Sequence, residues 1–191
     1  RNRAVTDTYE PGSTFKVVTV AGALSEGLVT PTTSFFLKDW IRVADRVVNE
    51  HEPRPAQQMT VSQILSNSSN IGTITLAEKL GRRNVARWID RFGFGRPTGI
   101  DFPGESRGIV LPVEKWSGST IGNVPLGQGV AVTPTQMARA YGAIANGGVA
   151  NEPYLVERVG GKRVHKPKQT RIISPTVAAQ LMAMLRNVVS E

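Results

Sequence analysis

The sequence predicts one α/β domain of the α+β kind, in which helices predominate over strands. Hydrophobic residues make up 40% of the 191 residues and charged residues 20%, a composition typical of a folded protein rather than a disordered one. Several segments begin at a helix cap and carry apolar residues at helical spacing. By contrast, one pair of segments has the pattern of a β-hairpin.

The first predicted helix covers residues 13–24. No charge follows Lys16 in this segment, so we expect the helix to be buried on most sides and to end near Gly27. Residues 34–49 mix β-branched, aromatic and charged side chains, and we expect them to form an irregular excursion that is poor in strands. A second helix is predicted to begin after Thr60, which forms a capping box with the glutamine three residues later.

Four more helices are predicted, each bounded by a residue that caps or ends a helix. They cover residues 71–80, 85–92, 133–145 and 174–189. Thr133 with Gln136 gives the third of these a capping box. Glycine and proline recur through residues 93–132, so this stretch is predicted to be rich in loops. The hairpin is predicted over residues 154–165, around Gly160 and Gly161.

The composition excludes several kinds of site. There is no cysteine, so disulfides, a cysteine nucleophile and thiolate metal sites are ruled out. His51 and His165 are the only histidines and form no His-Glu-x-x-His motif, so we expect neither a metal nor a cofactor. The net charge of +8 would suit nucleic acid, but the arginines are dispersed and no nucleic-acid-binding motif is present. We therefore expect no nucleic-acid partner.

Ser13 and Lys16 have the spacing of a nucleophile and its base. Three residues apart on the first turn of a helix, they lie on one face and can meet. A serine hydroxyl is a weak nucleophile unless a neighbour removes its proton, and a lysine does so only as a neutral amine, which apolar surroundings favour. The same spacing is typical of an N-cap serine followed by a lysine that reaches solvent, and this alternative stays open.

Ser68 and Asn70 form a Ser-x-Asn triplet at a predicted helix junction. A hydroxyl and an amide there could point into one cleft and act as a proton relay and as a hydrogen-bonding group for a substrate. A capped helix end would account for the triplet equally well.

Three segments together resemble the transpeptidase domain of penicillin-binding proteins. In chain order they read YEPGSTFK at residues 9–16, SSNIG at 68–72 and GQGVAVTPTQ at 127–136. The resemblance covers nearly the whole chain. The opening RNRAVTD and the glutamate before Pro11 look most like the class B, monofunctional, cell-division branch, with elongation and sporulation relatives close to it.

The resemblance implies a fold and a role for each motif residue. The fold is that of penicillin-binding proteins and serine β-lactamases, a five-stranded antiparallel sheet flanked by helices. Ser13 would be the nucleophile that becomes acylated, and Lys16 its general base. Ser68 and Asn70 would form the second catalytic motif and also bind the substrate.

The resemblance also implies a reaction. In the family, the serine attacks a peptidoglycan stem peptide ending in D-Ala-D-Ala and expels the last D-Ala, and an amine from a neighbouring strand resolves the ester. This chain would then belong to a D,D-transpeptidase of cell-wall synthesis that serves cell division or cell shape and is acylated by β-lactam antibiotics such as penicillins. The alternatives are a D,D-carboxypeptidase or β-lactamase-like hydrolase, with water as the acceptor, and a non-catalytic relative of the same fold.

The resemblance further implies where the intact protein acts. It would be anchored in the bacterial cell membrane with its catalytic domain on the extracytoplasmic face, and its partners would include the cell-division or elongation machinery. Gly127 and Gly129 match a glycine-rich segment of the family, and we expect them to shape the substrate-binding site rather than to catalyse.

One family motif is missing from the sequence. The third motif is Lys-Thr/Ser-Gly, yet no lysine here precedes Thr-Gly or Ser-Gly, and the nearest candidate, Lys162, precedes Arg163. We therefore expect residues 1–191 to be part of a single transpeptidase domain, without the strands before the nucleophile helix and without the Lys-Thr/Ser-Gly strand after it. Such a fragment should be mostly helical, lack most of the central sheet, and be inactive and only marginally stable alone.

Overall fold

The computed structural model describes residues 2–164 and 166–190 and is 44% helical and 16% strand. The predicted excess of helix over strand is confirmed. The helices are α1 (Arg3–Thr6), α2 (Lys16–Ser25), α3 (Val61–Ser66), α4 (Asn70–Leu80), α5 (Arg82–Phe92), α6 (Pro134–Ala145) and α7 (Pro175–Ser190). Short 3₁₀ turns are η1 (Gly12–Phe15), η2 (Val113–Lys115), η3 (Thr120–Gly122) and η4 (Val124–Leu126).

The strands are short and form antiparallel pairs. They are β1 (Ser34–Leu37), β2 (Trp40–Val43), β3 (Arg46–Asn49), β4 (Gln57–Thr60), β5 (Val149–Asn151), β6 (Arg158–Val159), β7 (Lys162–Arg163) and β8 (Gln169–Arg171). In the described part of the chain the sheets are two-stranded, pairing β1 with β4, β2 with β3, β5 with β8 and β6 with β7. The expectation of helices without a large central sheet is confirmed for these residues.

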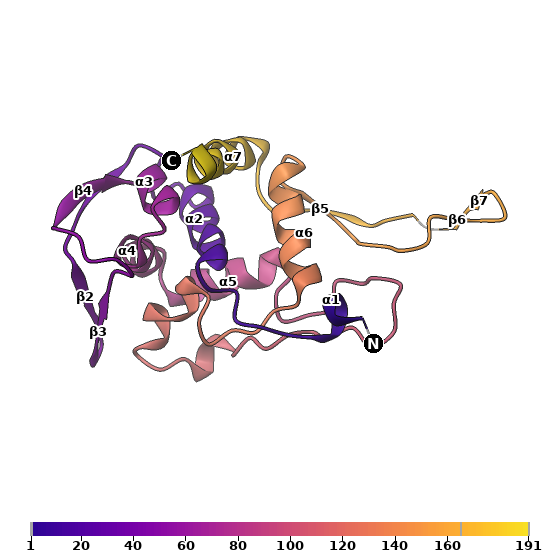
Figure 1. The fold of residues 1–191 in the computed structure, drawn as a ribbon, viewed down its shortest axis with the longest axis horizontal. Helices are drawn as coiled ribbons and strands as arrows, with labels where there is room; N and C mark the ends of the chain where they lie inside the picture. Colours follow the sequence, from indigo (N-terminus) through magenta and orange to yellow (C-terminus); the bar gives the residue numbers. More distant parts are fainter. Residues whose placement is uncertain (1, 165, 191) are drawn as a thin grey trace.

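Helix α2 lies at the centre of the core and packs against α4, α5 and α7 (Figure 1). Every residue from Lys16 to Leu24 is buried, as the lack of charge after Lys16 predicts. Gly22 allows the close approach of α5, because a Cβ there would lie 2.8 Å from the side chain of Trp88. The one difference from the prediction is that residues 12–15 form the 3₁₀ turn η1 rather than the first turn of α2.

The prediction for residues 34–49 is wrong, because three strands occupy this segment. β2 and β3 form a hairpin, and β1 pairs with β4, so that Ser34 lies opposite Thr60. Of the three strands' side chains, only Leu37 and Val43 are fully buried. The exposed and charged positions hide the apolar alternation that a strand would otherwise show, and the partner of β1 lies far along the chain.

The other local predictions are confirmed with shifted bounds. The capping boxes of Thr60 and Thr133 both form, and η2, η3 and η4 leave residues 93–132 rich in loops. The predicted hairpin is β6 and β7, at the end of an arm that extends from β5 away from the helices (Figure 1). Residue 165, included in that prediction, lies outside the described residues. The pairing of β5 with β8 was not predicted.

Candidate active site

Ser13 lies in the 3₁₀ turn that leads directly into the buried helix α2. In such a turn, residues three apart lie above one another, so Ser13 and Lys16 share a face as predicted. Gly12 makes the entry to the turn with a φ of 56°, a conformation that favours glycine. Ser13 is exposed and lines a cavity of about 460 Å³. The other lining residues are Glu50, His51, Glu52, Pro53, Arg54, Asn67, Ser68 and Ser69.

The amine of Lys16 is buried and joins the two predicted motifs. Only 1% of the residue is exposed, and Nζ donates hydrogen bonds to Asn70 Oδ1 at 2.7 Å, to Ser68 Oγ at 3.0 Å and to the carbonyl oxygen of Ser68. The structure therefore brings Lys16, Ser68 and Asn70 together across more than 50 residues of sequence. In the described residues, none of the hydrogen bonds of Nζ goes to Ser13.

The surroundings of Lys16 favour its neutral form. Burial lowers the pKa of this amine from 10.5 to about 8, although the nearby carboxylate of Glu50 acts in the opposite direction. A lysine with such a pKa holds a useful fraction of neutral amine near neutral pH and can accept a proton. The alternative of an N-cap serine followed by a lysine that reaches solvent is excluded for Lys16.

The junction between α3 and α4 positions the second motif. Ser68 has a φ of 52°, an uncommon conformation for a residue other than glycine, and this turn directs both its carbonyl and its hydroxyl to Lys16. Asn70 is the first residue of α4, and the side chain of Ser69 caps that helix by accepting the N–H of Gly72 at 2.9 Å. The motif is thus both a capped helix end and a set of groups facing Lys16.

Sequence reasoning missed the carboxylate of Glu50. It directly follows β3 and accepts hydrogen bonds from Ser69 Oγ at 2.5 Å, from Asn70 N at 2.7 Å and from Arg54 Nη2 at 2.5 Å. Burial would raise the pKa of Glu50, but these hydrogen bonds and the charge of Arg54 outweigh burial and lower it. The only signal in the sequence was a glutamate four residues before an arginine.

Gly127 and Gly129 lie beside the turn that carries Ser13. Gly127 accepts the N–H of Gly12 at 3.1 Å, and a Cβ at Gly127 would lie 2.2 Å from the oxygen of Gly12. Gly129 donates its N–H to the Glu10 carboxylate at 2.9 Å. Both glycines have a positive φ, so they permit backbone contacts that shape the segment around Ser13.

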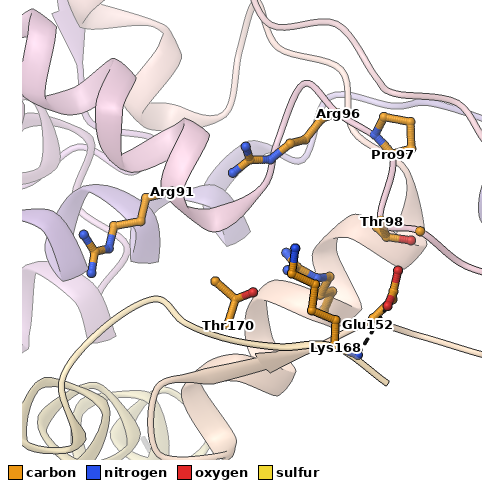
Figure 2. A pocket seen from close by; sticks show the side chains of 9 residues that line it. Arg91, Arg96, Pro97, Thr98, Glu152, Lys168 and Thr170 are labelled. Atoms are coloured by element: carbon orange, nitrogen blue, oxygen red, sulfur yellow. Dashed lines mark hydrogen bonds between the residues drawn. The ribbon is translucent and has the colours of Figure 1, made fainter. Parts of the chain in front are cut away.

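A second cavity, of about 380 Å³, shares no lining residue with the first. Figure 2 shows it between the chain near Arg96 and the segment of Lys168, just before β8, where the backbone N–H of Lys168 donates to Glu152. Arg91, Arg139 and a single carboxylate, Glu152, also line it. The residues predicted for the active site are all elsewhere.

Two further observations concern metals and membranes. In the described ranges, no group of three His, Asp or Glu side chains is placed to hold a metal ion. No described helix is both long and apolar enough to cross a membrane.

A family model described as the penicillin binding protein transpeptidase domain matches residues 1–191. The chain belongs to this transpeptidase family. PbpB of Mycolicibacterium smegmatis, a penicillin-binding protein, is 34% identical over 193 residues, which cover 98% of this chain and 30% of that protein. The probable peptidoglycan D,D-transpeptidase PbpC of Pseudomonas aeruginosa is 31% identical over 193 residues, which cover all of this chain and 33% of that protein.

The solved structures agree with the sequence relatives. The crystal structure of penicillin binding protein 3 from Mycobacterium tuberculosis in complex with aztreonam is similar with a TM-score of 0.95 and 33% identity, over all of this chain and 44% of that one. The predicted fold class and the predicted class B branch are confirmed. The chain spans about a third of the length of the curated relatives it matches.

Proposed function

We propose that the protein containing this chain is a peptidoglycan D,D-transpeptidase that works through an acyl-enzyme on Ser13. The observation that carries the proposal is the buried amine of Lys16, which is bonded to Ser68 and Asn70, together with the exposed Ser13, which lines the same cavity as Ser68. This arrangement occurs in a chain of the transpeptidase family. We infer that the protein takes peptidoglycan stem peptides as substrates.

In the proposed reaction, Ser13 Oγ attacks the carbonyl carbon of the penultimate D-Ala, and its proton passes to the neutral amine of Lys16. The C–N bond to the last D-Ala then breaks, that D-Ala leaves with a proton on its nitrogen, and an ester to Ser13 remains. An amine from a neighbouring stem peptide attacks the ester carbonyl, loses a proton to the site and forms the new amide. Ser13 regains its proton.

The hydrogen-bond partners of Lys16 suit these proton transfers. The carbonyl of Ser68 and the side-chain oxygen of Asn70 can only accept hydrogen bonds, so they hold two protons on the amine. The hydroxyl of Ser68 can accept or donate, so it offers a route from Lys16 to the leaving nitrogen. Within the described residues, Asn70 Nδ2 donates one long hydrogen bond, to the carbonyl oxygen of Asn49 at 3.4 Å, and this weak contact leaves it able to bond a substrate carbonyl.

The same site would be acylated by β-lactam antibiotics, since the relative from Mycobacterium tuberculosis binds aztreonam in its crystal structure. We further propose that the whole protein is membrane-anchored, acts on the extracytoplasmic face and works with division or elongation proteins. We also propose that Gly127 and Gly129 shape the substrate-binding site, because they contact the segment around Ser13. Within this proposal, residues 1–191 form part of one transpeptidase domain whose third motif lies on another segment of the protein.

The test is intact-mass analysis of the full-length protein after incubation with a penicillin, with Ser13→Ala as the control. We expect one stable adduct on the native protein and none on the variant. Turnover of the penicillin without a lasting adduct would favour the hydrolase alternative. An absent adduct together with an absent turnover would overturn the proposal and favour a non-catalytic relative.

A further inference from the structure

Glu50 contacts the second motif through two hydrogen bonds, to Ser69 and Asn70, and pairs with Arg54 through a third. The carboxylate accepts from Ser69 Oγ at 2.5 Å, from Asn70 N at 2.7 Å and from Arg54 Nη2 at 2.5 Å. Only 5% of the Glu50 side chain is exposed, so these charge-assisted hydrogen bonds form away from bulk water. A carboxylate is also favoured here because Asn70 begins α4, where backbone N–H groups point outward.

Asn70 links Glu50 to the base. Its backbone N–H donates to Glu50, and its side-chain oxygen accepts from Lys16 at 2.7 Å. Ser69, which donates to Glu50, lies between the two motif residues and caps α4. The carboxylate therefore fixes the backbone that carries both partners of the lysine.

Glu50 also acts on Lys16 through its charge, which opposes the effect of burial on the pKa of the amine. Among the described residues, Ser68 and Asn70 from the junction of α3 and α4 accept hydrogen bonds from Lys16, and Glu50 from the segment after β3 acts on it through its charge. Ser13 lies three residues before Lys16, in η1. Behind Glu50 lies Arg54, its salt-bridge partner. The exposed side chains of His51 and Glu52 line the cavity.

We propose that Glu50 is a positioning residue for acylation, which holds Ser68 and Asn70 against Lys16 and supplies the negative charge that this buried amine faces. The inference rests on the proposed function of Ser13 and Lys16. Glu50 holds the geometry through Ser69 and Asn70, and it acts on Lys16 through its charge. Its two effects, on geometry and on charge, can be separated by experiment.

The experiment measures the rate constant for acylation by a penicillin between pH 6 and 9.5, on full-length protein and by intact mass. Glu50→Gln keeps the shape and an acceptor oxygen but removes the charge, and it leaves Arg54 unpaired near the site. With less negative charge, the amine of Lys16 loses its proton more readily, so the acidic limb of the pH profile should move to lower pH. Glu50→Ala also removes the contacts, and its plateau rate should fall by about 10- to 100-fold.

The matched control is Glu78→Gln, which removes a negative charge from an exposed position later on the same helix α4. It should leave both limb and plateau unchanged. The inference is overturned if the Glu50 variants lose thermal stability alone. In that case the acidic limb of the pH profile of Glu50→Gln stays where it is in the native protein, and the plateau acylation rate of Glu50→Ala stays within twofold of native. Glu50 would then have a purely structural role. Failure of the native protein to form any adduct would instead remove the proposed function itself.

Discussion

Acylation of Ser13 should accelerate with pH around a midpoint near 8, the pKa of the Lys16 amine. Lysine must be neutral to take the serine proton. With a pKa lowered from 10.5 to about 8, roughly one amine in ten is neutral at pH 7. An ordinary lysine would be neutral in about one molecule in 3,000 at that pH. Burial therefore increases the reactive fraction by a few hundredfold, equivalent to about 3 kcal/mol.

The perturbation that isolates this effect is Lys16→Arg. The guanidinium keeps a positive charge and several N–H donors, but it stays protonated at every pH a protein tolerates. General-base catalysis contributes about 10²- to 10⁴-fold, so we expect a loss of that size in the acylation rate constant. The assay is formation of the penicillin adduct on full-length protein, followed by intact mass from pH 6 to 9.5.

The control is Lys79→Arg, at an exposed position of α4. It should acylate like the native protein, with the same midpoint. A native profile that is flat across this pH range would refute the assignment of Lys16 as the base. An Lys16→Arg variant that acylates within about fivefold of native would refute it as well.

Three further experiments test the geometry by substitution. Asn70→Asp places a carboxylate against the amine of Lys16, so the pKa of Lys16 should rise. The acidic limb of the pH profile of acylation should then move up by about 1–2 pH units. An unmoved limb would contradict the contact between Lys16 and residue 70. Gly127→Ala should destabilise the protein by about 2–4 kcal/mol in urea titrations and slow acylation, whereas Gly129→Ala, with similar φ but open space, should cost about 1 kcal/mol. Equal costs would argue against the backbone contact. Gly72→Ala should lower the free energy of unfolding by about 1–3 kcal/mol, because the added Cβ would clash with the side chain of Ile64. Adding Ile64→Ala to this variant removes the clash, so Gly72→Ala should cost less in that background.

The helices were predictable because their signals are local. A capping box joins residues three apart, so Thr60 and Thr133 mark helix starts that the structure reproduces. The strands of residues 34–49 were missed because the stability of a strand depends on its partner. The partner of β1 is β4, which lies far along the chain, so that Ser34 pairs with Thr60. A sequence window that contains one strand says little about a partner outside it.

The candidate site likewise has a part that local sequence predicts and a part that it does not. The shared face of Ser13 and Lys16 follows from their spacing, and their link to Ser68 and Asn70 came from the family resemblance rather than from any local pattern. Glu50 could not be foreseen. Its neighbours in sequence suggest a solvated loop, and its importance appears only when the chain brings it to the start of α4, 20 residues later.

The hydrogen bonds of Lys16 indicate what must precede attack by Ser13. An ammonium group has three donors, and the three acceptors around Nζ use all of them. A neutral amine has two, which the carbonyl of Ser68 and the side chain of Asn70 retain, so its lone pair becomes available on the side of the Ser68 hydroxyl. Attack by Ser13 must therefore be preceded by loss of one proton from Nζ, the proton that the Ser68 hydroxyl accepts.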